Sequence, residues 1–588
     1  MYPGSIFEYS DQSNISSLPV VTEVRNKPLF CAIFSSDKGP EEWTKVSGSD
    51  FFNLYGKQIS FDRHGQPLLQ AAMSINAGAE LLCKRLVADD STLANIGIVA
   101  KITTAEGNTT IEYLTKSSST ATTIKEAVAD ITEALGENEV LLYVITDNGR
   151  GASNKKIRIV PNYKISKNYN YVVYNLAVLE NDVELESFNF SANPNLIMNG
   201  QNISLDSIVT ANSTQIKCFA NEAGLKAVAT AVDEAVGDIN GTTLFTNDVL
   251  FAKNPKGQAI AGISVSTTGK DLQADTGLSL EGGVNGIFGD APYAVVADSD
   301  IPDVFEVRKT LTVGTDIDTV STSTIAGKVE NAASGDYVKV VTPGEADGAP
   351  ATTSYYVYNG SAWVIDDEID ADYIAKCDIK EAYINAAVDA LTGKYDNIIF
   401  NTDQYMIDAI IDANYPVTIK EKIASLVTFR EDYVYFRDMG LNVRKLDDIK
   451  NIVTASGYIK NKFCSDYCQS YDVIDPYSKK QITVTIGYDI AQKLVAHLNN
   501  GRNLPAAGLK YGFTVDNAIY GTLNFAPVIC PGAEEGDTVN EKEDLAELKV
   551  NYAAYINNQL VIESLYTSQE EDTQWSYINN VMGIQEVV

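Results

Sequence analysis

Few residues in this 588-residue chain have the types and spacing that catalysis would need. Histidine, the commonest general acid–base residue and a frequent zinc ligand, occurs only as His64 and His497. His64 lies between Arg63 and Gly65 in a predicted turn, and His497 lies among apolar residues of a predicted helix. No G-x-S-x-G nucleophile motif accompanies either histidine. We therefore predict structural or solvated histidines and no catalytic residue.

The seven cysteines indicate neither a disulfide framework nor a zinc site. Their number is odd and they are scattered along a long chain, unlike those of small disulfide-stabilised domains. Cys464 and Cys468 have the spacing to share one face of a helix, but no histidine or second cysteine pair is near enough to complete a zinc site. Buried thiols are the prediction.

Two acidic triplets and one glycine cluster are the remaining candidates for ligand binding. The triplets, 366–368 and 570–572, lack the D-x-[DN]-x-[DN]-G pattern of a calcium loop. The glycine cluster at 282–289 does not match G-x-G-x-x-G, and the chain contains no G-x-x-x-x-G-K-[ST] phosphate loop. We predict solvated turns for the triplets and a domain-junction turn for the glycines, with no cofactor and no metal.

The amino-acid composition of the chain indicates which kinds of partner it is not expected to bind. The chain has 78 acidic and 45 basic residues, a formal net charge of −33, which argues against nucleic acid and anionic membrane as partners. No run of 18 apolar residues predicts a transmembrane helix. Residues 1–9 lack the basic and apolar regions of a signal peptide, so we expect folding in the cytoplasm. Length alone suggests about three or four domains.

The elements expected at the two ends of the chain are of α/β type. An apolar run at 28–34 and another at 81–87 predict buried strands, joined by helices in a βαβ-like crossover. One helix is expected to begin at Ser47 and end at Gly56, and another to begin near Pro67 and end before Gly78. Further elements are expected after residue 378: a strand at 397–400, a helix capped by Asp403 through 411 and stopped near Pro416, a strand at 433–436 and a helix at 489–500.

The middle of the chain is predicted to be rich in β-structure. Thr123 and Glu126 form a capping box before a helix, and Asn359-Gly360 is a strong hairpin signal. The segment from 290 to about 370 reads as a small all-β surface module. Strands are expected at 140–145, 157–160, 171–174 and 176–179, with a helix at 223–236.

Nine segments, taken in chain order, resemble the contractile tail sheath proteins of bacteriophages and related injection machines. Their order extends over almost the whole chain, and Arg85 occupies the family's arginine position. The segments are YPGSIFEY (2–9), LFCAIF (29–34) with KGP (38–40), SDFFNLYG (49–56), the helix and strand at 66–86, GASN (151–154) with IRIV (157–160), FNFSANP (188–194), LEGGVNG (280–286), PAAG (505–508) and WSYIN (575–579).

The resemblance implies an α+β or α/β multidomain fold, with a discontinuous α/β core domain built from the N- and C-terminal parts and β-rich insertion domains. The expected division is an N-terminal arm at 1–22, the first part of the core at 23–95, a β-rich insertion domain at 96–289, a small all-β surface insertion at 290–374, and the second part of the core at 375–588. The part from Pro531 carries 12 acidic residues and two lysines.

The resemblance also implies a structural, non-enzymatic subunit that polymerises as stacked hexameric rings around an inner tube. Contraction would drive the tube through the host envelope in a viral contractile tail ejection system. Expected partners are other copies through exchanged terminal arms, the inner tail tube protein, and baseplate and tail terminator proteins. The sheath would assemble in the host bacterial cytoplasm and reside in the virion tail. The acidic C-terminal segment would hold the extended state through basic groups on a tube or neighbour.

Other interpretations stay open at this point. An acidic surface-layer or adhesin-like structural protein is the main alternative, and a glycan hydrolase with paired carboxylates is a third. The 290–370 segment has no counterpart in minimal sheaths. Asn580 and Val581 replace the basic residues usual after the WSYIN-type motif, and few residues follow. A reorganised arm, an arm supplied by another chain, and a continuation beyond the given sequence would each account for this.

Overall fold

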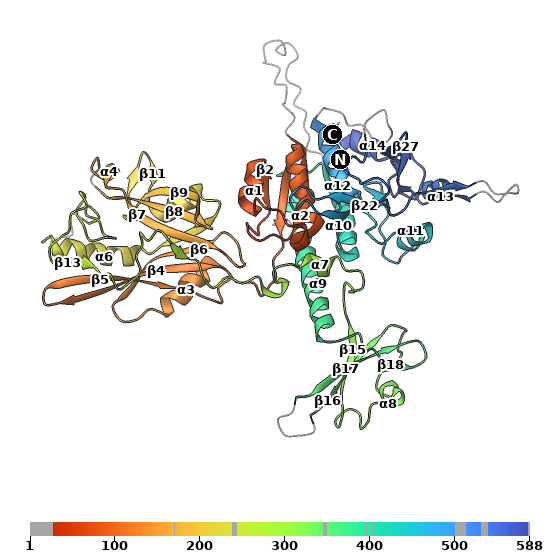
Figure 1. Cartoon of the computed structure of the whole chain (residues 1–588), viewed down its shortest axis with the longest axis horizontal. Helices are drawn as coiled ribbons and strands as arrows, with labels where there is room; N and C mark the ends of the chain where they lie inside the picture. Colours follow the sequence, from red (N-terminus) through yellow and green to blue (C-terminus); the bar gives the residue numbers. More distant parts are fainter. Residues whose placement is uncertain are drawn as a thin grey trace, which may run out of the picture.

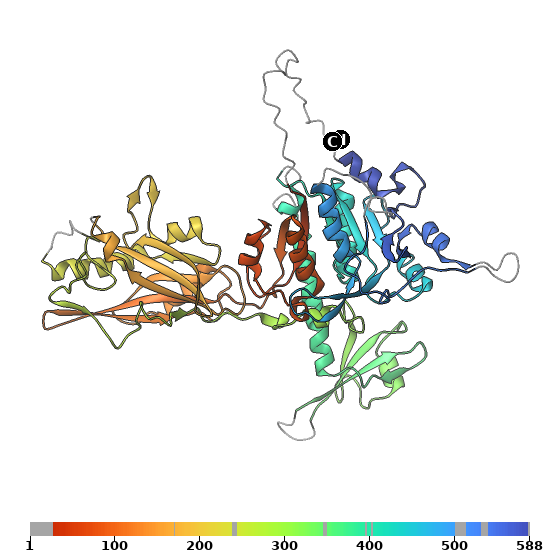
Figure 2. The same cartoon turned by 45° about the horizontal axis from the view of Figure 1, so that its top comes forward.

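The computed structural model describes residues 27–169, 171–237, 244–344, 350–393, 397–401, 404–499, 513–530 and 539–585. The predicted arm at 1–22 and the motif at 505–508 lie outside these ranges. Two β-rich bodies project from a central α/β body, one formed by residues after 95 and the other by residues after 305 (Figure 1). The view in Figure 2 shows that the two projections leave the central body in different directions.

The central body contains a seven-stranded sheet that joins the two ends of the chain. Its order is β2-β3-β1-β19-β20-β21-β26, and all neighbours are parallel except β2 and β3. Phe30 of β1 pairs with Ala409 of β19, so the two parts of the core meet at the centre of the sheet. The strands are β1 (Leu29–Phe34), β2 (Thr44–Ser47), β3 (Glu80–Arg85), β19 (Ala409–Ile411), β20 (Val434–Asp438), β21 (Cys464–Tyr467) and β26 (Val550–Asn551).

Nearly every residue of β1, β19, β20 and β21 is buried, as is typical of parallel strands covered on both faces, and this explains why β1, β19 and the first part of β20 read as apolar runs. The predicted βαβ crossover from β1 to β3 is confirmed. Helix α1 begins after Gly48 rather than at Ser47, and α2 is kinked at Gly65, so Pro67 lies in the first turn of the regular part. The helices of the central body are α1 (Ser49–Tyr55), α2 (Phe61–Ala77), α7 (Tyr293–Val296), α9 (Ala371–Ala390), α10 (Val417–Arg430), α11 (Leu446–Val453), α12 (Gly487–Asn499), α13 (Glu541–Glu547) and α14 (Ile578–Gln585).

Two predictions in the second part of the core are wrong. Residues 398–400 form a short 3-10 helix, η3 (Ile398–Phe400), rather than a strand. Residues 409–411 form strand β19 rather than the end of a helix, and Asp403 lies outside the described ranges. Pro416 immediately precedes α10 instead of ending a helix.

Three small hairpins complete the second part of the core. They are β22 (Ser470–Ile474) with β23 (Gln481–Thr485), β24 (Ile529–Cys530) with β25 (Val539–Asn540), and β27 (Ala553–Ile556) with β28 (Gln559–Ile562). The 3-10 helix η5 (Gln574–Ser576) follows them in the chain.

The larger projection has its own apolar core between two main sheets. Thr123 caps α3 as predicted, because its side chain accepts a hydrogen bond from the Glu126 N–H. The two strands predicted at 171–174 and 176–179 are one continuous strand, β8. The sheets are β12-β6-β4-β5-β13 and β14-β7-β8-β9. The elements are β4 (Asn95–Ala105), β5 (Asn108–Lys116), α3 (Ile124–Glu133), β6 (Glu139–Asp147), β7 (Lys155–Pro161), α4 (Tyr163–Ser166), β8 (Val173–Glu180), β9 (Val183–Ser191), β10 (Ile197–Met198), β11 (Gln201–Asn202), α5 (Leu205–Asn212), β12 (Ile216–Ala220), α6 (Glu222–Ala235), β13 (Ile263–Val265) and β14 (Leu278–Ser279). The 3-10 helix η2 (Gly286–Phe288) follows and belongs to the central body, because Phe288 lies in its core.

The smaller projection is a four-stranded sheet, β15-β16-β17-β18, over a small core that includes Trp363. The hairpin predicted at Asn359-Gly360 joins β17 to β18. The module is not all-β as predicted, because α8 (Thr322–Ala326) packs on it. Residues 288 and 296 belong to the core of the central body, so the module begins later than predicted. The strands are β15 (Val307–Thr312), β16 (Tyr337–Thr342), β17 (Thr352–Tyr358) and β18 (Trp363–Ile365).

No helix within the described ranges is both long and apolar enough to cross a membrane.

Candidate functional site

Arg85 lies where the central sheet meets the larger projection, and its guanidinium binds both. It is the last residue of β3 and is 3% exposed. Its Nε donates to Ser36 O (3.0 Å), and its Nη1 donates to Gly39 O (3.1 Å) and to Arg150 O (2.8 Å). One buried cation therefore ties the turn after β1 to the segment between β6 and β7. We call this region the Arg85 junction.

Four of the segments on which the sheath resemblance rests converge at the Arg85 junction. They are 38–40, 66–86, 151–154 and 280–286, and they come from three separate parts of the chain. The Asn285 side chain accepts a hydrogen bond from the Ala152 N–H (2.9 Å). A Cβ on Gly283 would lie 2.2 Å from Gly151 O, so the close approach of these two segments requires glycine. The predicted domain-junction turn at 282–289 is at this place.

Ion pairs and hydrogen bonds reinforce the Arg85 junction. Arg150 pairs with Glu41 (2.8 Å), and Lys38 pairs with Glu180 of β8 (2.8 Å). Burial alone would raise the pKa of Glu41, but hydrogen bonds from the Arg150 side chain and N–H hold it below its usual range. These contacts link the central body to the projection by charge as well as by packing.

His64 is buried beside this junction rather than solvated in a turn. Its Nε2 lies 2.7 Å from Asp37 Oδ1, and its Nδ1 lies 3.1 Å from Ser35 Oγ. Asp37 also accepts from Arg63 Nη1 (2.7 Å). Burial opposes ionisation of Asp37, yet the His64 hydrogen bond and nearby positive charge lower the pKa of that carboxyl. The three residue types match a hydrolase triad, but Ser35 and His64 are both buried and the ring nitrogens already contact residues of the fold, so the arrangement fixes the 35–40 turn.

A second buried charge cluster lies at the carboxyl ends of β19 and β20. Lys420 of α10 contacts Asp438 and lies 3.5 Å from Asp412 Oδ2. Thr485 Oγ1 also donates to Asp438 Oδ2 (2.7 Å). Burial, together with the charge of Asp438, raises the pKa of Asp412 to about 7, although Lys420 opposes the shift. Two acids share one buried lysine, so Asp412 holds a proton more readily than an ordinary carboxyl.

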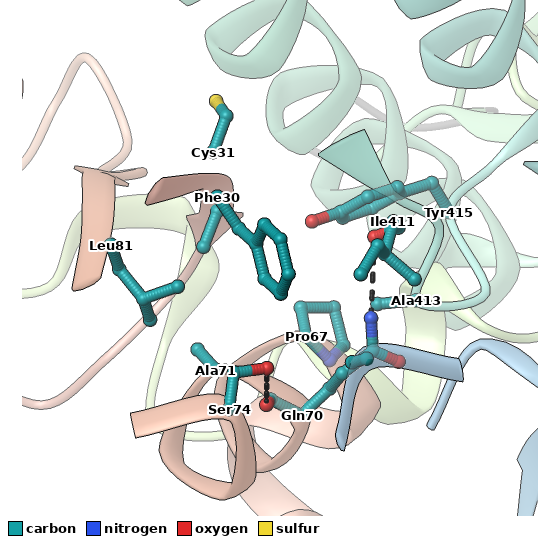
Figure 3. Close-up of a pocket in the computed structure, with 12 residues that line it drawn as sticks. Phe30, Cys31, Pro67, Gln70, Ala71, Ser74, Leu81, Ile411, Ala413 and Tyr415 are labelled. Atoms are coloured by element: carbon teal, nitrogen blue, oxygen red, sulfur yellow. Dashed lines mark hydrogen bonds between the residues drawn. The ribbon is translucent and has the colours of Figure 1, made fainter. Parts of the chain in front are cut away.

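A small pocket lies beside this cluster, inside the central body (Figure 3). The Gln70 side chain donates to Ile411 O (3.2 Å) and to Asp412 O (3.0 Å), and the Ser74 hydroxyl donates to Gln70 O (2.9 Å). These polar groups are therefore engaged within the fold. The remaining labelled lining is mainly apolar and comes from β1, β3, α2 and the segment after β19: Phe30, Cys31, Pro67, Ala71, Leu81, Ala413 and Tyr415.

Cys464 and Cys468 are buried free thiols as predicted, but Cys464 belongs to a strand. His497 is buried on α12. Within the described ranges, no group of three or more His, Cys, Asp or Glu side chains could hold a metal ion.

The acidic triplets contact residues of their own chain. Asp366 accepts from the Tyr337 hydroxyl (3.1 Å). Glu570 pairs with Lys460 (3.2 Å) and Asp572 pairs with Lys549. The Glu570–Lys460 pair links the C-terminal segment to an earlier part of the central body, and the Asp572–Lys549 pair lies within the segment; the sequence predicted neither contact. The expected contact of this segment with a tube or neighbouring subunit stays a prediction.

Sequence reasoning missed the Asp412 cluster and the partners of Arg85. Asp438 follows the predicted strand at 433–436 by two positions, but residues 409–411 are predicted to be helical, so no signal placed Asp412 at the carboxyl end of a neighbouring strand. No signal showed that Lys420 would lie between them.

No model of a known protein family matches the chain, and no curated protein matches its sequence. Among solved structures, its neighbours are tail sheath proteins and contractile sheaths. A sheath tail protein from Desulfitobacterium hafniense is similar over 97% of this chain and 80% of that one, with 9% identity and a TM-score of 0.36. One from Listeria innocua is similar over 95% and 75%, with 9% identity and a TM-score of 0.39. The contracted helical sheath of the anti-feeding prophage is similar over 34% and 56%, with 14% identity and a TM-score of 0.21.

Proposed function

We propose that this chain is the repeating subunit of a contractile tail sheath. Copies would form stacked hexameric rings around an inner tube, and contraction would drive the tube through the host envelope. The subunit would act by assembly and repacking, without catalysis. Its partners would be other copies, the tube protein, and baseplate and terminator proteins of a phage-like tail.

The observation that carries the proposal is the convergence of sheath-like segments on the Arg85 junction. Residues 38–40, 85, 151–154 and 280–286 are far apart in the sequence, yet they contact one another through Arg85, Asn285 and paired glycines. Separate local similarities would have no reason to meet at one place. Their meeting supports a shared architecture in which insertions leave a core that both ends of the chain build.

The central sheet also supports polymerisation. The edge strands of the sheet are β2 on one side and β26 on the other. Strand β26 pairs with β21 through only two residues. A sheet that ends in open strands can accept a strand from another copy. We propose that terminal arms of neighbouring subunits, including residues 1–22, supply such strands.

Electron microscopy of the purified full-length chain tests the proposal. We expect hollow tubes of sheath type, and we expect them to shorten and disappear when residues 1–22 are deleted while the subunit stays folded. Flat two-dimensional lattices would instead favour the surface-layer alternative. Monodisperse particles at every concentration and ionic strength would contradict both.

A further inference from the structure

Arg85 is a buried cation that retains unused hydrogen-bond donors. An arginine guanidinium carries five N–H groups. In Arg85, three of them are used by backbone carbonyls, through Nε and Nη1. Among the residues that the structure describes, Nη2 has no hydrogen-bond acceptor and the guanidinium has no ion pair. Both N–H groups of Nη2 and a buried positive charge are therefore available to a partner outside the described fold.

The acids near Arg85 each pair with a different cation. Three carboxylates lie close enough to stabilise the charge of Arg85, yet none of them contacts it. Their ion pairs are Glu41–Arg150 (2.8 Å), Asp147–Lys155 (2.7 Å) and Asp37–Arg63 (2.7 Å). Burial lowers the pKa of Arg85 although these acids oppose the shift, so its charge is only partly compensated. The three pairs leave one positive charge in excess, on Arg85.

A pocket lies beside this guanidinium, within the Arg85 junction. Arg85, Gly151 and Asn285 are among the residues that line it. A Cβ on Gly151 would lie 3.2 Å from Arg85 Nη2, so Nη2 is next to the space that this glycine leaves open. The pocket has a volume of about 30 Å³, which is room for roughly two water molecules or one ion of similar size. The pocket therefore places the unused donors of Arg85 beside a space suited to a small ligand.

Two further lining residues connect the pocket with solvent. The side chains of Arg63 and Asp290 are 37% and 81% exposed, so an ion can enter without unfolding of the chain. The Asp290 carboxylate is the one acid of the lining that is this exposed, and solvent screens its charge. It therefore offsets little of the charge on buried Arg85. Water could accept hydrogen bonds from Nη2, but it would leave a buried charge without a counter-ion, which is costly.

We propose that this pocket binds a small monovalent anion, of about the size of chloride, on Arg85 Nη2. The anion accepts charge-assisted hydrogen bonds from both N–H groups and balances the single excess charge. Because Arg85 already binds both the turn after β1 and the segment between β6 and β7, neutralising it fastens the larger projection to the central body. The site belongs to the isolated subunit and does not depend on whether that subunit assembles into a sheath.

Hydrogen exchange of the full-length chain in different sodium salts tests the proposal. Sodium chloride replaces sodium gluconate stepwise at constant ionic strength, because the gluconate anion is monovalent but too large for the pocket. Amides of residues 150–152 report opening of the junction. Their exchange should slow as chloride rises, by roughly tenfold when chloride reaches about ten times its dissociation constant. Exchange in β20 should not change and corrects for general salt effects.

The line width of the chloride-35 NMR signal gives a second measurement, because chloride bound to a protein gives a far broader signal than the free ion. We expect the full-length chain to broaden the signal and Arg85→Gln to abolish this broadening. Arg308→Gln is the matched control, because Arg308 is a partly exposed arginine that already pairs with Asp336 (2.5 Å). The broadening should persist in this control.

Three results would overturn the proposal. Equal exchange at residues 150–152 in chloride and in gluconate would show that the pocket holds water only. Broadening that persists in Arg85→Gln would place chloride elsewhere on the chain. Protection of residues 150–152 by sulfate as strong as that by chloride would contradict a site for a small monovalent ion. The exchange comparison needs no substitution, so it decides the question even if Arg85→Gln opens the junction by itself.

Discussion

Replacing Arg85 by alanine should loosen the junction between the central body and the larger projection without unfolding either. The substitution removes three hydrogen bonds from a buried guanidinium to the carbonyls of Ser36, Gly39 and Arg150. Hydrogen bonds to charged groups contribute about 1.5–3 kcal/mol each, and an unpartnered buried carbonyl costs further free energy. Because water can enter the vacated space and satisfy some carbonyls, we expect a local cost of about 3 kcal/mol.

Hydrogen exchange followed by mass spectrometry measures this local cost directly. Amides of residues 150–152 are protected by bonds to Glu41, Thr92 and Asn285, so they report opening of the junction. A cost of about 3 kcal/mol predicts roughly a hundredfold faster exchange there. Exchange in β20, which is separated from β3 by β1 and β19 in the sheet, should change little.

Two further variants make the result interpretable. Arg85→Lys keeps the charge but loses the planar fork, so its effect should be intermediate. Arg63→Ala is the control, because Arg63 and Asp37 form a partly exposed pair (2.7 Å) of the kind worth about 0–1 kcal/mol. The reasoning is refuted if Arg85→Ala leaves exchange at 150–152 unchanged, or if Arg63→Ala accelerates it as much.

The remaining predictions concern the buried charges, the smaller projection and the acidic C-terminal segment. Because the pKa of Asp412 is raised to about 7, its protonated form favours the fold, so the destabilisation that Asp412 causes is absent below about pH 4 and grows as pH rises to about 7. Asp412→Asn should therefore increase the free energy of unfolding by up to about 4 kcal/mol at pH 8, by less than half of that at pH 5 and by little below about pH 4, which thermal denaturation at several pH values measures; a difference independent of pH would contradict this. Replacing residues 307–369 with a short Gly/Ser linker should preserve folding and the polymers seen in electron micrographs, because the rings of Phe305 and Tyr373, which flank the replaced segment, lie 6.0 Å apart. Removing residues 290–370 should instead also destabilise the central body, because Val296 belongs to its core. Neutralising Glu570 and Asp572 together should lower the free energy of unfolding by about 1 kcal/mol at low salt and by less at high salt, because both carboxylates are exposed and salt screens their ion pairs. Denaturation at several salt concentrations measures this, with Glu571→Gln as the control; an equal loss of stability in the control would contradict the prediction.

The sequence by itself determined the elements whose signals are local. Strands β1 and β3, the Thr123-capped helix, the hairpin at Asn359-Gly360 and helix α12 were all predictable, because capping, apolar periodicity and turn chemistry act within a few residues. The same local reasoning failed at β19. Its three residues look like part of a helix, and they form a strand because they pair with β1 across 379 positions of sequence.

Only the tertiary structure decided what the charged residues do. Arg85 was visible in the sequence, but its three acceptors are backbone carbonyls, which every residue carries and no pattern identifies. The shifted Asp412 depends on Asp438 and Lys420 meeting in a space from which water is excluded. Hydrogen bonding and desolvation depend on which atoms are neighbours in space, and in this chain those neighbours come from distant parts of the sequence.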